Sequence, residues 1–132
     1  MWRYGAGTGW TPQPFNEGLE TSGALQVWDF DFGSAQVLAA TYDGVYMRSI
    51  GGARWQRLGD ALAGQSVRSI ALVGSTVYAG LLPGGIYTLD LNGAQVWKRT
   101  DNGIPFVRDL VYDQDHCQGL LAATGDGVWV YR

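Results

Sequence analysis

Short runs of mixed apolar and polar residues, separated by glycine-containing turns, repeat along this chain every 40 to 42 residues. Each unit begins with a similar four-residue motif. The three copies are Val27-Trp28-Asp29-Phe30, Val67-Arg68-Ser69-Ile70 and Val107-Arg108-Asp109-Leu110. A second marker follows at Gly44-Val45-Tyr46, Gly85-Ile86-Tyr87 and Gly127-Val128-Trp129. Runs this short with many turns predict β-strands rather than helices.

The middle unit shows the plan of one repeat. Its expected strands are Val67–Leu72, Thr76–Leu81, Ile86–Leu91 and Val96–Thr100. The first two are joined by Gly74-Ser75 and the last two by Asn92-Gly93, which are hairpin turn signals. Four antiparallel strands repeating at this period are typical of a β-propeller blade. The sequence therefore predicts an all-β propeller.

The flanking units follow the same plan, but the last one is incomplete. The first is expected to form strands at Val27–Phe32, Gln36–Thr41, Val45–Ser49 and Trp55–Leu58. The third is expected at Val107–Tyr112, Gly119–Thr124 and Val128–Tyr131, without a fourth strand. The N-terminal segment up to Trp10 aligns with Met47–Trp55, so it supplies the fourth strand that the third unit lacks. We therefore expect three four-stranded blades, at approximately residues 24–62, 63–104 and 105–132, the last completed by residues 1–19 of a partner chain.

Composition narrows the class of protein. The chain of 132 residues is 46% hydrophobic and 16% charged, with twenty glycines, which excludes disorder and gives no membrane span. The net charge is −3 and the basic residues form no cluster, so no nucleic-acid partner is expected. No basic stretch followed by an apolar run is visible at the N-terminus, and Cys117 is alone, which favours a soluble protein of a reducing compartment such as the cytoplasm.

Two stretches resemble known propeller repeats. The run from Asp101 to Leu110, followed by Ala122 to Trp129, resembles the repeat of two-component-regulator sensor propellers, with their Asn-Gly-Leu-Pro crossover. The run from Gly44 to Trp55 is similar to the Asp-box repeat of sialidase-like propellers, although its aspartate is absent. Both resemblances imply a propeller architecture, and both families host sensors, lectins, hydrolases and scaffolds.

Polar residues of the first strand in each unit are the candidate ligand site. The first strands line the axial channel of a propeller, and Asp29, Asp109, Arg68 and Arg108 lie on them. One interpretation is that these side chains pair to satisfy a wet channel. The other is a binding site for a small polar or anionic molecule, with the two arginines as forked hydrogen-bond donors.

Three tryptophans occupy matching positions and give an alternative site. Trp10, Trp55 and Trp97 recur near the fourth strand of each unit. Repetition at this place favours packing between blades, and the alternative is a platform that stacks on glycans, as in an oligomeric lectin.

Metal, cofactor and catalytic sites are not predicted. Asp113, Asp115, His116 and Cys117 offer metal-ligand types, but nearly contiguous residues of one turn rarely converge on one ion, so we interpret them as a solvated hairpin tip. No nucleophile elbow or phosphate loop occurs, and His116 is the only histidine. We expect a non-catalytic binding or interaction module; the alternatives are a lectin and an engineered or truncated propeller fragment without a ligand.

The expected partner is a second copy of the chain. Three blades form an open arc with two apolar end faces, which soluble proteins do not leave exposed. Closed propellers have about 4 to 8 blades, and six is the only multiple of three in that range. We therefore predict a homodimer closing a six-bladed ring, in which the strand around Trp10 pairs with Val128–Tyr131 of the partner by strand exchange.

Overall fold

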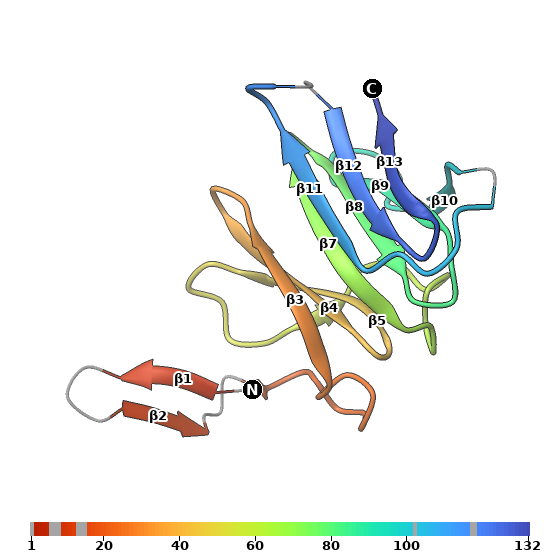
Figure 1. The fold of residues 1–132 in the computed structure, drawn as a ribbon. Helices are drawn as coiled ribbons and strands as arrows, with labels where there is room; N and C mark the ends of the chain where they lie inside the picture. The colour runs from red at the N-terminus through yellow and green to blue at the C-terminus, as the bar shows by residue number, and fades with distance from the viewer. Residues whose placement is uncertain (1, 6–8, 13–15, 102, 117–118) are drawn as a thin grey trace.

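The computed structural model describes residues 2–5, 9–12, 16–101, 103–116 and 119–132, and these ranges form short β-strands (Figure 1). The strands are β1 Trp2–Gly5, β2 Gly9–Pro12, β3 Val27–Phe32, β4 Gln36–Thr41, β5 Gly44–Ser49, β6 Gln56–Arg57, β7 Val67–Val73, β8 Thr76–Leu81, β9 Ile86–Asp90, β10 Lys98–Arg99, β11 Asp109–Asp113, β12 Gly119–Thr124 and β13 Gly127–Tyr131. No helix in these ranges is long and apolar enough to cross a membrane.

The strands form antiparallel sheets in which neighbours follow chain order. Blade 1 is β3-β4-β5-β6, blade 2 is β7-β8-β9-β10, and blade 3 is β11-β12-β13. β1 and β2 form a separate two-stranded hairpin in which the backbone of Tyr4 is paired with that of Trp10. The predicted all-β fold with repeated four-stranded units is confirmed, and β13 is followed by no fourth strand in the described part of blade 3.

Tight turns connect the strands where glycine allows them. Gly74 has a φ of 63° in the two-residue loop between β7 and β8, a left-handed conformation that costs glycine little. Gly44 and Gly127 both have a φ of 83° and open the third strand of blades 1 and 3. In each case a threonine two residues before the aspartate of the turn, Thr41 or Thr124, donates its hydroxyl to the glycine carbonyl.

Several predicted strand boundaries are wrong, most clearly those of the fourth strands and of β11. The fourth strands were expected at Trp55–Leu58 and Val96–Thr100, but β6 and β10 each contain only two residues. Trp55 and Trp97 precede them and turn into the cores between sheets, which removes them from the ladder. β11 begins at Asp109 instead of Val107, because the Val107 N–H donates to the Leu81 carbonyl of blade 2, at 3.1 Å.

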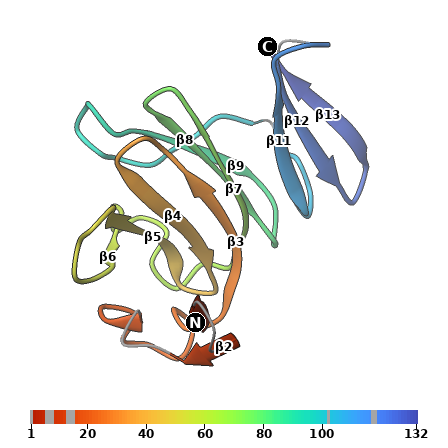
Figure 2. The same ribbon diagram turned by 90° about the vertical axis from the view of Figure 1, so that its left-hand side faces the viewer.

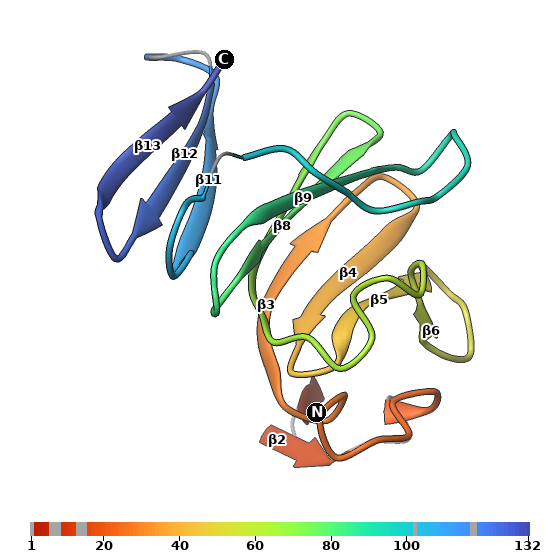
Figure 3. The same cartoon turned by 90° about the vertical axis from the view of Figure 1, so that its right-hand side faces the viewer.

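The three blades pack face to face in chain order (Figure 2). One core cluster joins blades 1 and 2, and a second joins blades 2 and 3. A third cluster joins blade 1 to the segment that contains Leu19 and Ala24. β7 lies between β3 and β11, so the first strands of the blades are neighbours (Figure 1). The β1–β2 hairpin lies at the opposite end of this arc from β13 (Figure 3).

Candidate functional site

The structure brings the two predicted axial carboxylates onto one hydroxyl. Asp29, Ser69 and Asp109 occupy the same position on β3, β7 and β11. Ser69 Oγ lies 3.1 Å from Asp29 Oδ2 and 3.3 Å from Asp109 Oδ1. The middle residue was not identified from the sequence, although its repeat position is the same as that of the two aspartates.

These side chains also bond to the backbone of the next blade. The Ile70 N–H donates to Asp29 Oδ2 at 3.1 Å, and the Leu110 N–H donates to Ser69 Oγ at 2.9 Å. The donors occupy equivalent positions, so the same link joins blade 1 to blade 2 and blade 2 to blade 3. Hydrogen bonds to a carboxylate are stronger than neutral ones, and these bonds hold the inner strands in register.

The two predicted arginines are placed differently from each other. The Arg68 guanidinium lies 4.8 Å from the centre of the Trp28 ring, which is a cation–π contact between blades 2 and 1. Arg108 is exposed on the approach to β11. Within the described residues, no ion pair or hydrogen bond joins either arginine to Asp29 or Asp109. The two predicted aspartates therefore share a hydrogen-bonded cluster with Ser69, and the two predicted arginines are not part of it.

Trp55 and Trp97 lie in the core. Trp55 is 1% exposed beside the N-terminal segment, and Trp97 is 5% exposed between blades 1 and 2. The Trp97 indole N–H donates to the Leu58 carbonyl, at 2.6 Å. A ring buried in this way offers no face for stacking on a sugar. Trp10 lies on β2, and its side chain is outside the described part of the chain.

The polar hairpin tip organises its own turn. Asp113 Oδ1 accepts hydrogen bonds from the N–H groups of Asp115 and His116, each at 3.1 Å, and lies 3.2 Å from His116 Nδ1. Asp115 and His116 are exposed, and Cys117 lies outside the described residues. The contacts are those of a capped surface turn.

A charged cluster that the sequence analysis missed surrounds Asp43. Its Oδ2 accepts from Arg57 at 2.5 Å and from Thr21 at 2.9 Å, and its Oδ1 accepts the Gly64 N–H at 2.6 Å. Burial alone raises the pKa of Asp43, but the bonds from Gly64, Thr21 and Arg57 outweigh it, so the pKa falls below its usual value. This carboxylate fastens the crossovers before and after blade 1.

A second ionised carboxylate, Asp101, lies in the crossover that follows blade 2. It accepts hydrogen bonds from Arg99 at 3.0 Å and from the backbone N–H groups of Ile86, Gly103 and Ile104, each at 2.8 Å. Burial raises the pKa of this carboxyl, whereas these four donors lower it, and the net pKa lies well below its usual range. Asp101 is therefore ionised at neutral pH.

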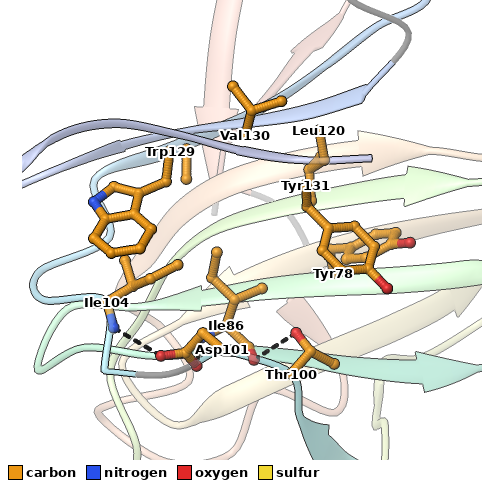
Figure 4. A pocket seen from close by; sticks show the side chains of 10 residues that line it. Tyr78, Ile86, Thr100, Asp101, Ile104, Leu120, Trp129, Val130 and Tyr131 are labelled. Carbon is orange, nitrogen blue, oxygen red and sulfur yellow. Dashed lines mark hydrogen bonds between the residues drawn. The ribbon is translucent and has the colours of Figure 1, made fainter.

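A cavity of about 190 Å³ opens beside Asp101, between blades 2 and 3 (Figure 4). Ile86 and Ile104 line it from blade 2 and its crossover, and Leu120 and Ala122 line it from β12. The side chains of β13 form its outer rim; they are Trp129, Val130 and Tyr131. The cavity is therefore mainly apolar and lies next to the last strand of the arc.

β13 is an exposed strand at the end of the arc. It pairs with β12 on one side, and its other edge pairs with no strand in the described ranges. All five of its residues are exposed. An exposed, apolar strand edge is a surface on which another strand can add.

Comparison with known proteins identifies the fold. No protein-family model matches the sequence, and no curated protein sequence matches it. Among solved structures, the extracellular domain of the putative hybrid two component system BT4673 from B. thetaiotaomicron matches 99% of this chain, with a TM-score of 0.76 and 19% identity. A second structure of the BT4673 extracellular domain, described as a putative one component system, matches 92% with a TM-score of 0.71 and 20% identity.

A computationally designed protein matches as well. Ika4 aligns with 80% of this chain at a TM-score of 0.64 and 22% identity. The chain spans 64% of Ika4 and only 16% and 17% of the two BT4673 chains. At these identities the likeness shows the fold alone. It confirms that the chain is built of propeller blades, as the resemblance to two-component-regulator propellers implies.

Proposed function

We propose that this chain is a non-catalytic interaction module whose two end faces associate with a second copy to close a six-bladed propeller. The observation that supports it is a comparison of equivalent positions. Phe30 at one end of the arc and Val128 at the other are exposed, although their counterparts inside the arc are buried between blades. Ala39 and Tyr46 of blade 1 are covered by the segment that contains Leu19 and Ala24.

The end of blade 1 shows this at Phe30. Phe30 is 41% exposed, whereas Ile70 and Leu110, at the same repeat position, are 3% and 5% exposed. Each of the latter two packs in the core between its own blade and the preceding one. Phe30 therefore lacks the preceding blade that its position requires.

The end of blade 3 shows the complementary pattern at Val128. Val128 is 72% exposed, whereas Val45 and Ile86, at the same repeat position, are 0% and 6% exposed. Val111 on β11 is also exposed, whereas its counterpart Ala71 is buried. Blade 3 therefore lacks a following blade to pack against. The free face of blade 3 and the free face of blade 1 are the two sides of the interface that neighbouring blades form inside the arc.

The series of hydrogen bonds that links the inner strands of neighbouring blades would also continue from blade 3 to blade 1 of the second copy. Asp29 accepts the Ile70 N–H and Ser69 accepts the Leu110 N–H. Asp109 is next in this series, and the equivalent donor on a following blade is the N–H of Phe30 of the second copy. In the single chain this N–H donates to Asp29 Oδ1, at 2.9 Å, so closure would require it to change its acceptor to Asp109. Two chains supply six blades, within the range of about 4 to 8 that closes. A two-fold dimer satisfies both pairs of end faces at once.

Solution mass measured at micromolar concentration tests the proposal. The wild-type chain should have the mass of two chains, and Val128→Asp should be monomeric, because a carboxylate would be buried without a partner. Ile50→Asp is the matched control, since Ile50 is 60% exposed and lies in the turn after β5, outside the strands. A monomeric wild type, a trimer, or a Val128→Asp variant that remains a dimer would each contradict the proposal.

We assign ligand binding to the central channel of the closed propeller. Closure repeats each inner strand, so Arg68, Arg108, Asp29 and Asp109 each occur twice around the channel. Arg108 is exposed, and a guanidinium binds anions through forked, charge-assisted bonds. We therefore place a small anionic ligand at the channel mouth, with the arginines as donors, and we assign no catalytic role to the chain.

A further inference from the structure

The cavity between blades 2 and 3 occupies the place where the gap between blades 1 and 2 holds an indole. Ile86, Ile104 and Ala122 line the cavity. Their repeat counterparts are Val45, Leu62 and Ala79, which all belong to the core cluster that contains Trp97. The two gaps therefore have the same walls, and one of them contains a tryptophan that the other lacks.

The polar partner of the indole is repeated as well. The Trp97 indole N–H donates to the Leu58 carbonyl, at 2.6 Å. The Leu58 N–H itself donates to the Val45 carbonyl, and in blade 2 the Thr100 N–H donates in the same way to the Ile86 carbonyl. Thr100 is thus the structural equivalent of Leu58, and it lines the cavity (Figure 4). By this equivalence, the Thr100 carbonyl is the acceptor expected for an indole inserted into the cavity.

We propose that this cavity is an indole-binding site and that its occupant is Trp10 of a second copy of the chain. Trp10 shares the repeat position of Trp55 and Trp97, three residues before the residue equivalent to Leu58 and Thr100. The β1–β2 hairpin lies at the opposite end of the arc from β13, so β2 is remote from the β13 of its own chain (Figures 1 and 3). This inference rests on the proposed two-fold closure, which places the N-terminal hairpin of one copy beside β13 of the other.

The size and lining of the cavity suit this occupant. An apolar cavity of about 150 Å³ accepts benzene, and the volume here is about 190 Å³. The ring would fill the apolar space, and its N–H would donate to the Thr100 carbonyl. The strand that carries Trp10 would then lie along the free edge of β13 and complete blade 3.

Sedimentation equilibrium over a concentration series, on full-length chains, tests the site. Trp10→Ala should weaken the dimer by at least about 30-fold in Kd, the effect expected of a central tryptophan in an interface. Trp10→Phe keeps an aromatic ring without the N–H donor and should fall between this variant and the wild type. Free indole added to Trp10→Ala should restore part of the lost affinity and raise the thermal midpoint.

A substitution in the wall of the cavity tests the site without changing Trp10. Ala122→Phe fills the cavity from β12, so it should weaken the dimer and, combined with Trp10→Ala, abolish the rescue by indole. Ala53→Phe, in an exposed loop, is the control for the added ring. A circular dichroism melt of each variant reports whether the blades are still folded.

The outcomes separate this inference from the proposed function. A monomeric wild type overturns the closure and with it the second copy as occupant. A wild-type dimer that Trp10→Ala leaves equally tight overturns the indole site while the dimer stands. A weakened Trp10→Ala dimer that indole does not rescue also overturns insertion into the cavity. Weakening, rescue by indole and loss of rescue in the Ala122→Phe background together support it.

Discussion

Gly80 of β8 packs directly against Val107 at the start of the third unit. A Cβ at this position would stand 2.3 Å from Cγ1 and 2.9 Å from Cβ of Val107, and Val107 is fully buried. Gly80→Ala should therefore lower the free energy of unfolding by about 1–3 kcal/mol, the usual effect of overpacking. Urea unfolding measures the change.

A second substitution checks the cause of that loss. Val107→Ala removes the atoms that the new Cβ meets, so the double variant should lose less stability than the sum of the two single losses. Strictly additive losses would show that the contact between Gly80 and Val107 is not what excludes a side chain.

Asp101 gives the protein a defined response to acid. Its folded pKa lies below the unfolded value of about 3.9, so the carboxylate stabilises the fold above that value and loses its effect as the pH falls through and below it. The free energy of unfolding should drop between pH 7 and pH 3, and Asp101→Asn should be less stable at pH 7 with a smaller drop. Denaturant unfolding at the two pH values measures both. An equal drop in the variant would assign the acid sensitivity to other groups, such as Asp43.

Candidate site residues could be predicted from the sequence where they stand at the same position in more than one repeat. Asp29 and Asp109 stand out because each follows the same marker at the start of a unit, and they do share a contact. Asp43 was not identified, because Thr21 and Gly64 reach it from crossovers 22 and 21 residues away. Such partners depend on tertiary packing. The Thr-x-Asp-Gly turn at Thr41, repeated at Thr124, was the available signal.

At the scale of elements, the N-terminal hairpin should be required for association. Removal of residues 1–10 takes away β1 and the start of β2, so β13 would keep a free edge in every copy. The shortened chain should be monomeric or aggregated, as an unprotected edge strand predicts. Size-exclusion chromatography with light scattering distinguishes these states. A well-folded dimer after this removal would contradict strand exchange.

The elements themselves could be predicted closely, because a hairpin is a local structure. The bounds of β3, β4 and β8 match the expected ranges, since turn glycines and alternation define both ends of each strand. The fourth strands were predicted too long. Whether Trp97 stays in the ladder or enters the core depends on the neighbouring blade, and no local pattern reports that choice.

For the whole molecule, anion binding should depend on the arginines of the axis. Citrate or phosphate should raise the thermal midpoint of the wild-type dimer, because an anion bound to the folded form stabilises it. Arg68→Ala combined with Arg108→Ala should remove that rise and leave the mass unchanged. Arg54→Ala is the matched control, since Arg54 pairs with Glu20 at the surface, at 2.7 Å. A rise that survives the double change would refute the axial site.

The hydroxyl of Ser69 carries one hydrogen and faces two carboxylates. The hydroxyl can therefore take two orientations, donating its hydrogen either to Asp29 in blade 1 or to Asp109 in blade 3. In the lone arc Asp29 also accepts the N–H groups of Ile70 and Phe30. In the proposed ring the Phe30 N–H of the second copy would donate to Asp109 instead, so Asp29 would lose one donor and the Ser69 hydroxyl would turn toward it. Assembly would in this way select the orientation of a single proton at the centre of the molecule.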